Sequence, residues 1–210
     1  MRTGLTLPSL PPPREYPGAK SRGFSLIELM VVVAVVAVLA AMAFPNLVGV
    51  VRANRLTALS NDVVGVLQNA RLEALRRNVR VVVCPSSNGT SCSGSVAATG
   101  WEGMISFVDP DNNNTLAAAG DILRVHPVTA PLQLRASANL GGNRIVFRPD
   151  GFAYTTAGDL MTAMLAACLP ETDPPQNVRD IAIGSGARIV LVRRAAAGVC
   201  GTPPNTPPSS

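Results

Sequence analysis

The stretch from Arg22 to Pro45, RGFSLIELMVVVAVVAVLAAMAFP, restricts what this 210-residue chain can fold into more than any other part of it. Between Phe24 and Phe44, every residue except Ser25 and Glu28 is apolar or alanine. As an α-helix these residues reach roughly 30 Å, the thickness of the hydrocarbon core of a bilayer. The sequence therefore predicts one membrane-spanning helix.

Glu28 is the only charged residue of this span and lies close to its start. An unpaired carboxylate in the hydrocarbon layer costs several kcal/mol unless a cation neutralises it, so intramembrane acids usually have a function. Glu28 is thus the first functional residue that the sequence indicates. A plain signal anchor, whose Glu28 side chain extends to the membrane interface, is the alternative interpretation.

Residues 1–23, ahead of the span, are basic and rich in proline. They lack the apolar run that an ordinary secretory signal places before its cleavage site. Arginine and lysine at this end predict that the leader stays in the cytoplasm while the C-terminal body crosses the membrane. The remaining residues carry 14 arginines against 12 acids, so the body of the protein is only weakly basic.

The residues Gly23-Phe24-Ser25-Leu26-Ile27-Glu28-Leu29 resemble the class III signal of type IV pilins and pseudopilins. In that family a prepilin peptidase cuts after the glycine and methylates the new N-terminal phenylalanine. The resemblance implies processing at Gly23 and Phe24, removal of the leader 1–23, and a transmembrane and assembly helix over 24–45. It also implies single-pass anchoring in the bacterial inner membrane, a periplasmic head, and other pilin or pseudopilin subunits as partners.

Simple electrostatics gives Glu28 a role in that assembly. A cut after Gly23 creates an amine at Phe24, and the Glu28 carboxylate of a packed neighbour can pair with it. Assembly would then neutralise two charges that a lone subunit leaves unpaired in the apolar layer. Pro45 is expected to kink the helix without ending it, because neighbouring groups can satisfy the freed carbonyl.

Helical periodicity continues beyond Pro45, which predicts an amphipathic helix over 46–78. Its apolar stripe recurs at three- and four-residue steps and consists of Leu56, Leu59, Val63, Leu67, Ala70 and Ala74. The helix is expected to end at about Arg77, with Asn78 as the stop before a strand. Such a stripe must be buried against another element.

The helix end Ala70-Arg71-Leu72-Glu73-Ala74-Leu75-Arg76-Arg77-Asn78, followed by a strand from Val81 to Cys84, resembles the GspH/FimT branch of the pilins. Cys92 and Trp101-Glu102-Gly103 match the cysteine loop and the Trp-x-Gly strand of that branch. The resemblance implies an α+β pilin-like fold, in which a long N-terminal helix packs on antiparallel β-sheets. It also implies a minor type IV pilin of a pilus tip or initiation complex. A GspH-type pseudopilin of a type II secretion system is an alternative.

The region 79–200 is expected to form a β-rich head, because short apolar runs alternate with turn signals. The expected strands are Val79–Cys84, Met104–Val108, Ile122–Val125, Leu132–Arg135, Arg144–Phe147, Ala163–Leu169, Val178–Ile183 and Arg188–Val192. Residues 201–210 contain only Gly, Thr, Pro, Asn and Ser, a composition that predicts a disordered tail.

Four cysteines in a chain with an export signal favour disulfides over a metal site. Pairing of neighbours along the chain would join Cys84 to Cys92 and Cys168 to Cys200. Sequence alone allows three connectivities. Two bridges would suit a small head with few aromatic residues, since each contributes about 2 to 4 kcal/mol to stability.

No pattern in the chain points to catalysis, a cofactor or a metal site. His126 is the only histidine, which excludes histidine-based triads and sites built from several histidines. Oxygen-bearing side chains alternate from Asp109 to Asn114, but this stretch lacks the glycine and the distal glutamate of an EF-hand. An Asx-rich turn is the preferred interpretation, and the protein is not expected to be an enzyme.

Some members of the FimT group resemble DNA receptors that carry a Gly-Arg-x-Arg motif after the penultimate strand. Here the turn reads Gly184-Ser185-Gly186-Ala187-Arg188-Ile189, so the motif is not intact. Arg188, Arg193 and Arg194 remain as candidates for contacts with the phosphates of double-stranded DNA. The alternative is that Arg188 and Arg194, whose even spacing favours one face, lie on the solvated face of a strand and bind no ligand.

Overall fold

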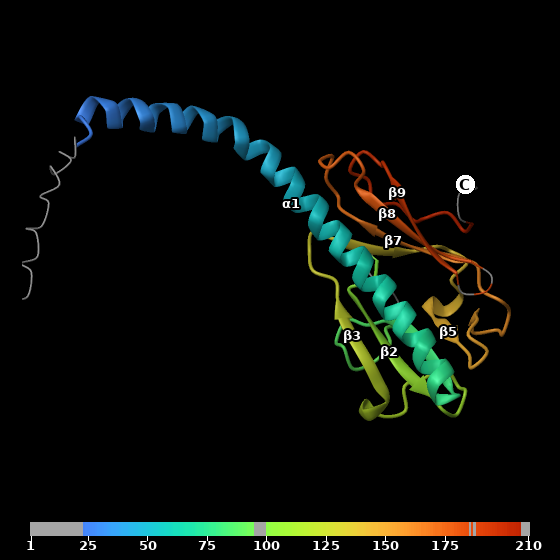
Figure 1. The fold of residues 1–210 in the computed structure, drawn as a ribbon. Helices are drawn as coiled ribbons and strands as arrows, with labels where there is room; N and C mark the ends of the chain where they lie inside the picture. The colour runs from blue at the N-terminus through green and yellow to red at the C-terminus, as the bar shows by residue number, and fades with distance from the viewer. Residues whose placement is uncertain (1–22, 95–99, 185, 187, 207–210) are drawn as a thin grey trace, which may run out of the picture. The chain divides into compact units, whose positions relative to one another are not determined.

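The longest element is α1, which contains the 52 residues Leu26–Arg77 (Figure 1). It continues through Pro45, as expected for a proline that does not end its helix. It stops at Arg77, and Asn78 follows with a φ of 55°. Helices commonly end on a residue in this left-handed conformation, which asparagine adopts more readily than most side chains.

The structure is a computed structural model that describes residues 23–94, 100–184, 186 and 188–206, with the backbone alone for 42–46. The expected leader up to residue 22 lies outside the described residues. The chain divides into two units, residues 1–43 and 44–210, which are described separately.

In the first unit, the described part of α1 has exposed apolar side chains on all sides. Their exposed fractions lie between 50% and 79% for Phe24, Leu26, Ile27, Leu29, Met30, Val31, Val32, Val33, Val35, Val36, Val38 and Leu39. Over the ranges that the structure describes, no helix has both the length and the hydropathy that a membrane crossing needs.

The second unit contains two antiparallel sheets. The five-stranded sheet has the order β3-β2-β1-β5-β6, and the four-stranded sheet has the order β4-β7-β8-β9. The first consists of β1 (Arg80–Pro85), β2 (Gly103–Asp109), β3 (Ile122–Pro127), β5 (Ile145–Phe147) and β6 (Ala153–Tyr154). The second consists of β4 (Gln133–Ala136), β7 (Ala163–Cys168), β8 (Val178–Ile183) and β9 (Ile189–Arg194). Two short 3-10 turns, η1 (Ala119–Asp121) and η2 (Gly141–Asn143), lie in the connections.

The core of this unit lies between the C-terminal half of α1 and the inner faces of both sheets (Figure 1). All six residues of the predicted stripe are at most 5% exposed. They pack with strand residues such as Val81, Phe147, Leu165 and Ile181, and with Trp101. The expected fold, a long helix packed on antiparallel sheets, is confirmed.

The eight expected strands are all present, with ends that differ from the prediction by at most two residues. The prediction missed β6, the two residues Ala153–Tyr154 that pair with Val146 and Phe147. A strand this short has no periodicity of its own and forms only because the turn at Asp150 brings it beside β5.

The predicted disordered tail is partly ordered, which corrects the expectation for residues 201–206. Pro203 is buried, and the amide of Asn139 donates a 3.2 Å hydrogen bond to the Asn205 side chain. The side chain of Asn139 donates a second hydrogen bond, of 3.1 Å, to the Asn205 carbonyl. Composition could not predict these contacts, because they depend on a loop 66 residues away in the sequence. Residues 207–210 lie outside the described residues.

We expect Leu67→Ala to lower the free energy of unfolding by about 2 to 5 kcal/mol, because Leu67 is fully buried in the core. Leu72→Ala is the matched control, since Leu72 lies on the same helix but is 61% exposed, and its effect should stay within about 0.5 kcal/mol. Denaturant unfolding of the purified full chain, followed by fluorescence of the buried Trp101, measures both. Equal effects of the two substitutions would contradict the burial of this stripe.

Candidate functional site

The peptide bond between Gly23 and Phe24 is accessible in the structure. A Cβ built on Gly23 would meet no atom within 4 Å, and Phe24 is 79% exposed. The helix begins three residues after Gly23, at Leu26, so the bond lies in an irregular segment. A peptidase can therefore bind this segment without first unwinding a helix.

Ser25 caps the start of α1. Its hydroxyl oxygen accepts a 3.3 Å hydrogen bond from the backbone N–H of Glu28, and its carbonyl accepts one of 3.2 Å from Leu29. The spacing Ser-x-x-Glu is the sequence signature of a capping box, which was not among the predicted features. The helix start is thus determined locally, and Glu28 occupies its first turn.

The carboxylate of Glu28 is exposed, and within the described part of the chain it forms no ion pair. The partial positive charge of the helix N-terminus favours a carboxylate at this position. The two carboxylate oxygens of Glu28 are not used by the cap, because the capping bond joins the Ser25 hydroxyl to the backbone N–H of Glu28. Glu28 can therefore accept a cation from another molecule.

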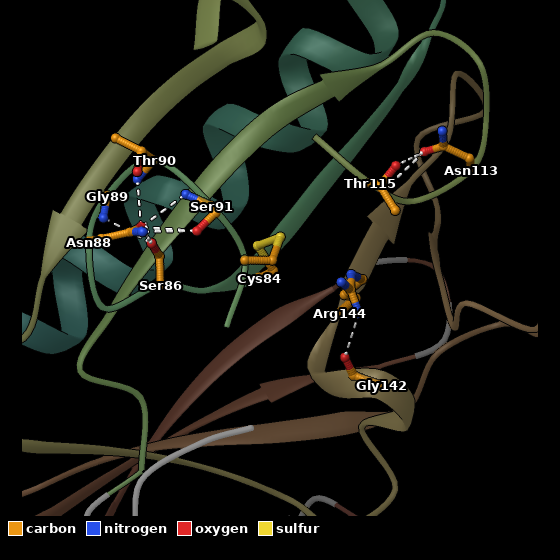
Figure 2. The surroundings of a disulfide bond; sticks show 11 residues. Cys84, Ser86, Asn88, Gly89, Thr90, Ser91, Asn113, Thr115, Gly142 and Arg144 are labelled. Atoms are coloured by element: carbon orange, nitrogen blue, oxygen red, sulfur yellow. Dashed lines mark hydrogen bonds between the residues drawn. A yellow bond between two sulfur atoms is a disulfide. The ribbon is translucent and has the colours of Figure 1, made fainter. Parts of the chain in front are cut away.

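A disulfide joins Cys84, in β1, to Cys92, with 5.6 Å between the two Cα atoms (Figure 2). The loop between them is held by Asn88, whose Oδ1 atom accepts hydrogen bonds from the backbone N–H groups of Thr90 and Ser91. Cys84 itself lies in an apolar cluster with Phe107 and Ile105 of β2. The bridge thus attaches a polar loop to the buried centre of the five-stranded sheet.

A second disulfide joins Cys168, at the end of β7, to Cys200, again with Cα atoms 5.6 Å apart. Asn177 supports the same region: its Oδ1 atom accepts a 2.8 Å hydrogen bond from the Ala196 N–H, and its Nδ2 atom donates one of 2.9 Å to the Leu169 carbonyl. The segment after β9 therefore packs on the outer face of the four-stranded sheet, where it covers Ala166 and Val178.

The stretch after β2 forms an Asx-rich turn. The Asp109 carboxylate is buried and accepts hydrogen bonds of 3.1 Å from the backbone N–H groups of Asn113 and Asn114. Burial raises the pKa of Asp109, and the neighbouring Asp111 carboxyl raises it further, while these N–H donors lower it. Among the described residues, no group of three or more His, Cys, Asp or Glu side chains has the geometry to hold a metal ion.

The three arginines proposed for DNA contacts have different surroundings. Arg188 lies exposed in the turn before β9, and residues 185 and 187 of that turn are outside the described residues. Arg193 is also exposed. Arg194 instead forms a bidentate pair with Asp180 of β8, through its Nε atom and through an Nη2–Oδ1 hydrogen bond of 3.0 Å. This pairing raises the pKa of Arg194 above its usual value.

Strand alternation explains why neighbouring arginines differ. Arg194 lies diagonally across from Asp180, with Val178 directly opposite it, so both charged side chains lie on the outer face of the sheet. Arg193 points to the other face, where it lies directly opposite Arg179. The structure therefore does not bring Arg193 and Arg194 together as one basic patch. Sequence reasoning missed Asp180 and Arg179, because their roles depend on the register of β8 and β9.

Two family models match the chain. "Prokaryotic N-terminal methylation motif" matches residues 18–44, and "Type II transport protein GspH" matches residues 59–187, which is more than half of the 210 residues. A methylation motif at the start of a long helix that packs on antiparallel sheets defines a type IV pilin-like protein. Within that class, the chain belongs to the GspH family.

Two crystal structures of the type IV minor pilin FimU from Pseudomonas aeruginosa are similar to this chain. One is 19% identical with a TM-score of 0.49, and the match covers 66% of this chain and 89% of that chain. The other crystal form is 19% identical with a TM-score of 0.43, covering 67% of this chain and 90% of that one. A search of the curated proteins found no match.

We expect non-reducing peptide mapping by mass spectrometry to find Cys84 linked to Cys92 and Cys168 linked to Cys200. In the structure each pair is bonded, and the described residues include no free cysteine. The protein should be expressed in an oxidising compartment, where disulfides form, and purified without reductant. Free thiols, or a peptide that joins Cys92 to Cys168, would contradict this arrangement.

We expect Arg194→Gln to lower the free energy of unfolding by about 3 kcal/mol, because it leaves the Asp180 carboxylate buried without its cation. Arg193→Gln, one residue away, should have no destabilising effect, since Arg193 is exposed and has a like charge opposite it. Thermal or denaturant unfolding of the purified full chain measures the difference. Equal destabilisation by the two variants would show that the Arg194–Asp180 pair does not stabilise the fold.

Proposed function

We propose that this protein is a minor type IV pilin, a structural subunit that is cleaved after Gly23, methylated at Phe24 and incorporated into a pilus tip or initiation complex. The observation that supports this best is the start of the chain: an accessible glycine, an exposed Phe24, and an unpaired Glu28 in the first turn of α1. The partners are a prepilin peptidase and other pilin subunits.

The described part of α1 in the first unit supports the proposed assembly. Its large apolar side chains are mostly more than half exposed, which is a costly surface in water. Lipid and the helices of neighbouring subunits are the two surroundings that suit such a surface. We therefore place the subunit in the bacterial inner membrane before assembly, with a periplasmic head. The proposed segments are the leader 1–23, the assembly helix 24–45, the amphipathic helix 46–78 and the head 79–200.

The charge of Glu28 favours the helices of neighbouring subunits over lipid. In lipid, its carboxylate has no protein cation within the described residues, whereas a packed neighbour can offer the amine created at Phe24. The pairing would remove two charges from an apolar layer in one step. Glu28 therefore favours assembly over the free subunit, and Pro45 lies where the apolar half of the helix gives way to the amphipathic half.

A pseudopilin of a type II secretion system is the second candidate, and the description of the matching family, "Type II transport protein GspH", favours it. The processing signal and the packing of the helix are the same in both proposals. Genes that encode pilus components or secretion components beside this one would distinguish the two systems.

A role in DNA uptake has less support in the geometry. Arg194 is neutralised by Asp180, which leaves Arg188 and Arg193 as the exposed cations of this region. Binding to phosphates without sequence preference depends on several cations along one surface. A gel shift with duplex DNA at low and high salt tests this proposal directly.

We expect Glu28→Ala to leave membrane insertion intact and to reduce the amount of the tagged full chain in sheared filaments at least about tenfold, a factor that corresponds to 1.4 kcal/mol. The physical reason is that the neighbouring Phe24 amine would lose its only proposed partner. Immunoblots of the filament and membrane fractions measure incorporation and insertion separately.

Two further variants separate charge from size. Glu28→Gln keeps the shape of the side chain but removes its charge, so it should be lost from filaments as Glu28→Ala is. Glu102→Gln makes the same change at an exposed position of the head and should incorporate normally. Normal incorporation of Glu28→Ala would contradict the proposed pairing of Glu28 with the Phe24 amine of a neighbouring subunit.

A further inference from the structure

Two arginines lie directly opposite each other in the four-stranded sheet. The register of β8 and β9 pairs Arg179 with Arg193, so their side chains leave the sheet on the same face. Like charges directly opposite in an antiparallel pair repel each other. Neither of them forms an ion pair with a carboxylate of the described residues. The arrangement is unfavourable for the lone subunit.

Arg179 is the more unusual of the two because it is 95% buried, with 5% of its surface exposed. Its Nη1 atom donates hydrogen bonds of 2.7 Å to the Gln176 carbonyl and 3.2 Å to the Val178 carbonyl. Its Nε atom is buried and has no hydrogen-bond partner. Burial and the adjacent Arg193 charge both lower the pKa of Arg179. The two carbonyls fix the guanidinium in place but do not neutralise it.

The same sheet also contains a buried charge that is neutralised, which can be compared with Arg179. On its outer face, the buried Asp180 is neutralised by Arg194, so this chain does pair a buried charge where a partner lies within reach. On the inner face, the Arg179 guanidinium interacts, among the described residues, only with two carbonyl dipoles and with the like charge of Arg193. An anion placed between the two arginines would satisfy the free Nε atom and cancel the repulsion, as charge-assisted hydrogen bonds do.

We propose that Arg179 and Arg193 form a binding site for a carboxylate side chain of a neighbouring filament subunit. The site rests on the proposed function in that the partner is another pilin-like chain. Arg193 reaches the partner from the surface, and Arg179, held by its carbonyls, presents a fixed donor beneath it. The incoming Asp or Glu binds where the subunit itself has no acid.

The surroundings suit a protein partner better than a nucleic acid. β9 is the edge strand of its sheet, and Leu191, which lies on the same face of β9 as Arg193, is 38% exposed. An apolar side chain beside a recessed cation suits the core of a protein interface, in which a charged pair is shielded from water. An extended segment of the partner can also pair with the free edge of β9.

The test is Arg193→Glu in the full chain. The new carboxylate lies opposite Arg179, so it should pair with Arg179 inside the subunit and occupy the site. We expect a higher melting temperature of the purified protein than that of the unmodified chain. We also expect at least a tenfold loss of incorporation into sheared filaments, because the partner's carboxylate now meets a filled site.

Arg188→Glu is the matched control, since it makes the same charge change at an exposed arginine before the same strand. It should leave both the melting temperature and incorporation unchanged. Arg193→Lys keeps the charge and should incorporate more than Arg193→Glu. An equal loss for Arg188→Glu and Arg193→Glu would overturn the site, because net charge alone would then explain the effect.

The remaining outcomes also test the proposed site. A lower melting temperature for Arg193→Glu would contradict the internal pair and overturn the site, as would normal incorporation of that variant. Loss of duplex DNA binding in a gel shift, with incorporation intact, would assign the arginines to nucleic acid instead. If the proposed function itself fails, the unmodified chain is absent from filaments, whereas failure of the site alone leaves the unmodified and Arg193→Glu chains equally incorporated.

Discussion

The head depends on burial of the apolar stripe of α1. Six residues of the helix, from Leu56 to Ala74, are almost completely buried against the inner faces of two sheets. The head has few aromatic residues, so its core consists largely of aliphatic side chains, with Trp101 and Phe147 among the largest. Without the helix, both sheets would expose these faces to water. The same helix carries the methylation motif at its other end, and we propose that assembly and folding use this one element.

The charges of the four-stranded sheet follow from strand alternation. On one face of the sheet, Arg194 neutralises the buried Asp180. On the other face, Arg193 lies opposite the buried Arg179, and neither has an acid within reach among the described residues. Adjacent residues of β9 thus have different roles. Arg194 stabilises the sheet, and Arg193, as we propose, contacts a partner. Arg193 and Arg194, which are adjacent in the sequence and suggest one basic patch, lie on opposite faces of the sheet.

Much of the fold could be predicted from the sequence because the signals are local. The helix stripe has a clear period, and Asn78 is a typical stop, so the end of α1 and its buried face follow from the pattern. The strand ends shifted by a residue or two, since hydrogen bonding to neighbouring strands determines them. The contact of Asn205 with Asn139 and the pairing of β6 were not predicted, because they depend on residues brought together by the fold. The cap formed by Ser25 could have been read from the spacing Ser-x-x-Glu.

The sequence alone determined the class of protein and the position of Glu28, and it predicted the site of processing, because these depend on residues within a few positions of each other. It also determined that one helix face must be covered, since an apolar stripe cannot remain in water. Only the tertiary structure decided which arginine is neutralised and which is available. That distinction depends on the register of β8 against β9, which places Asp180 near Arg194 and Arg179 opposite Arg193. Register is a property of two strands together, and a one-residue shift would have exchanged the faces.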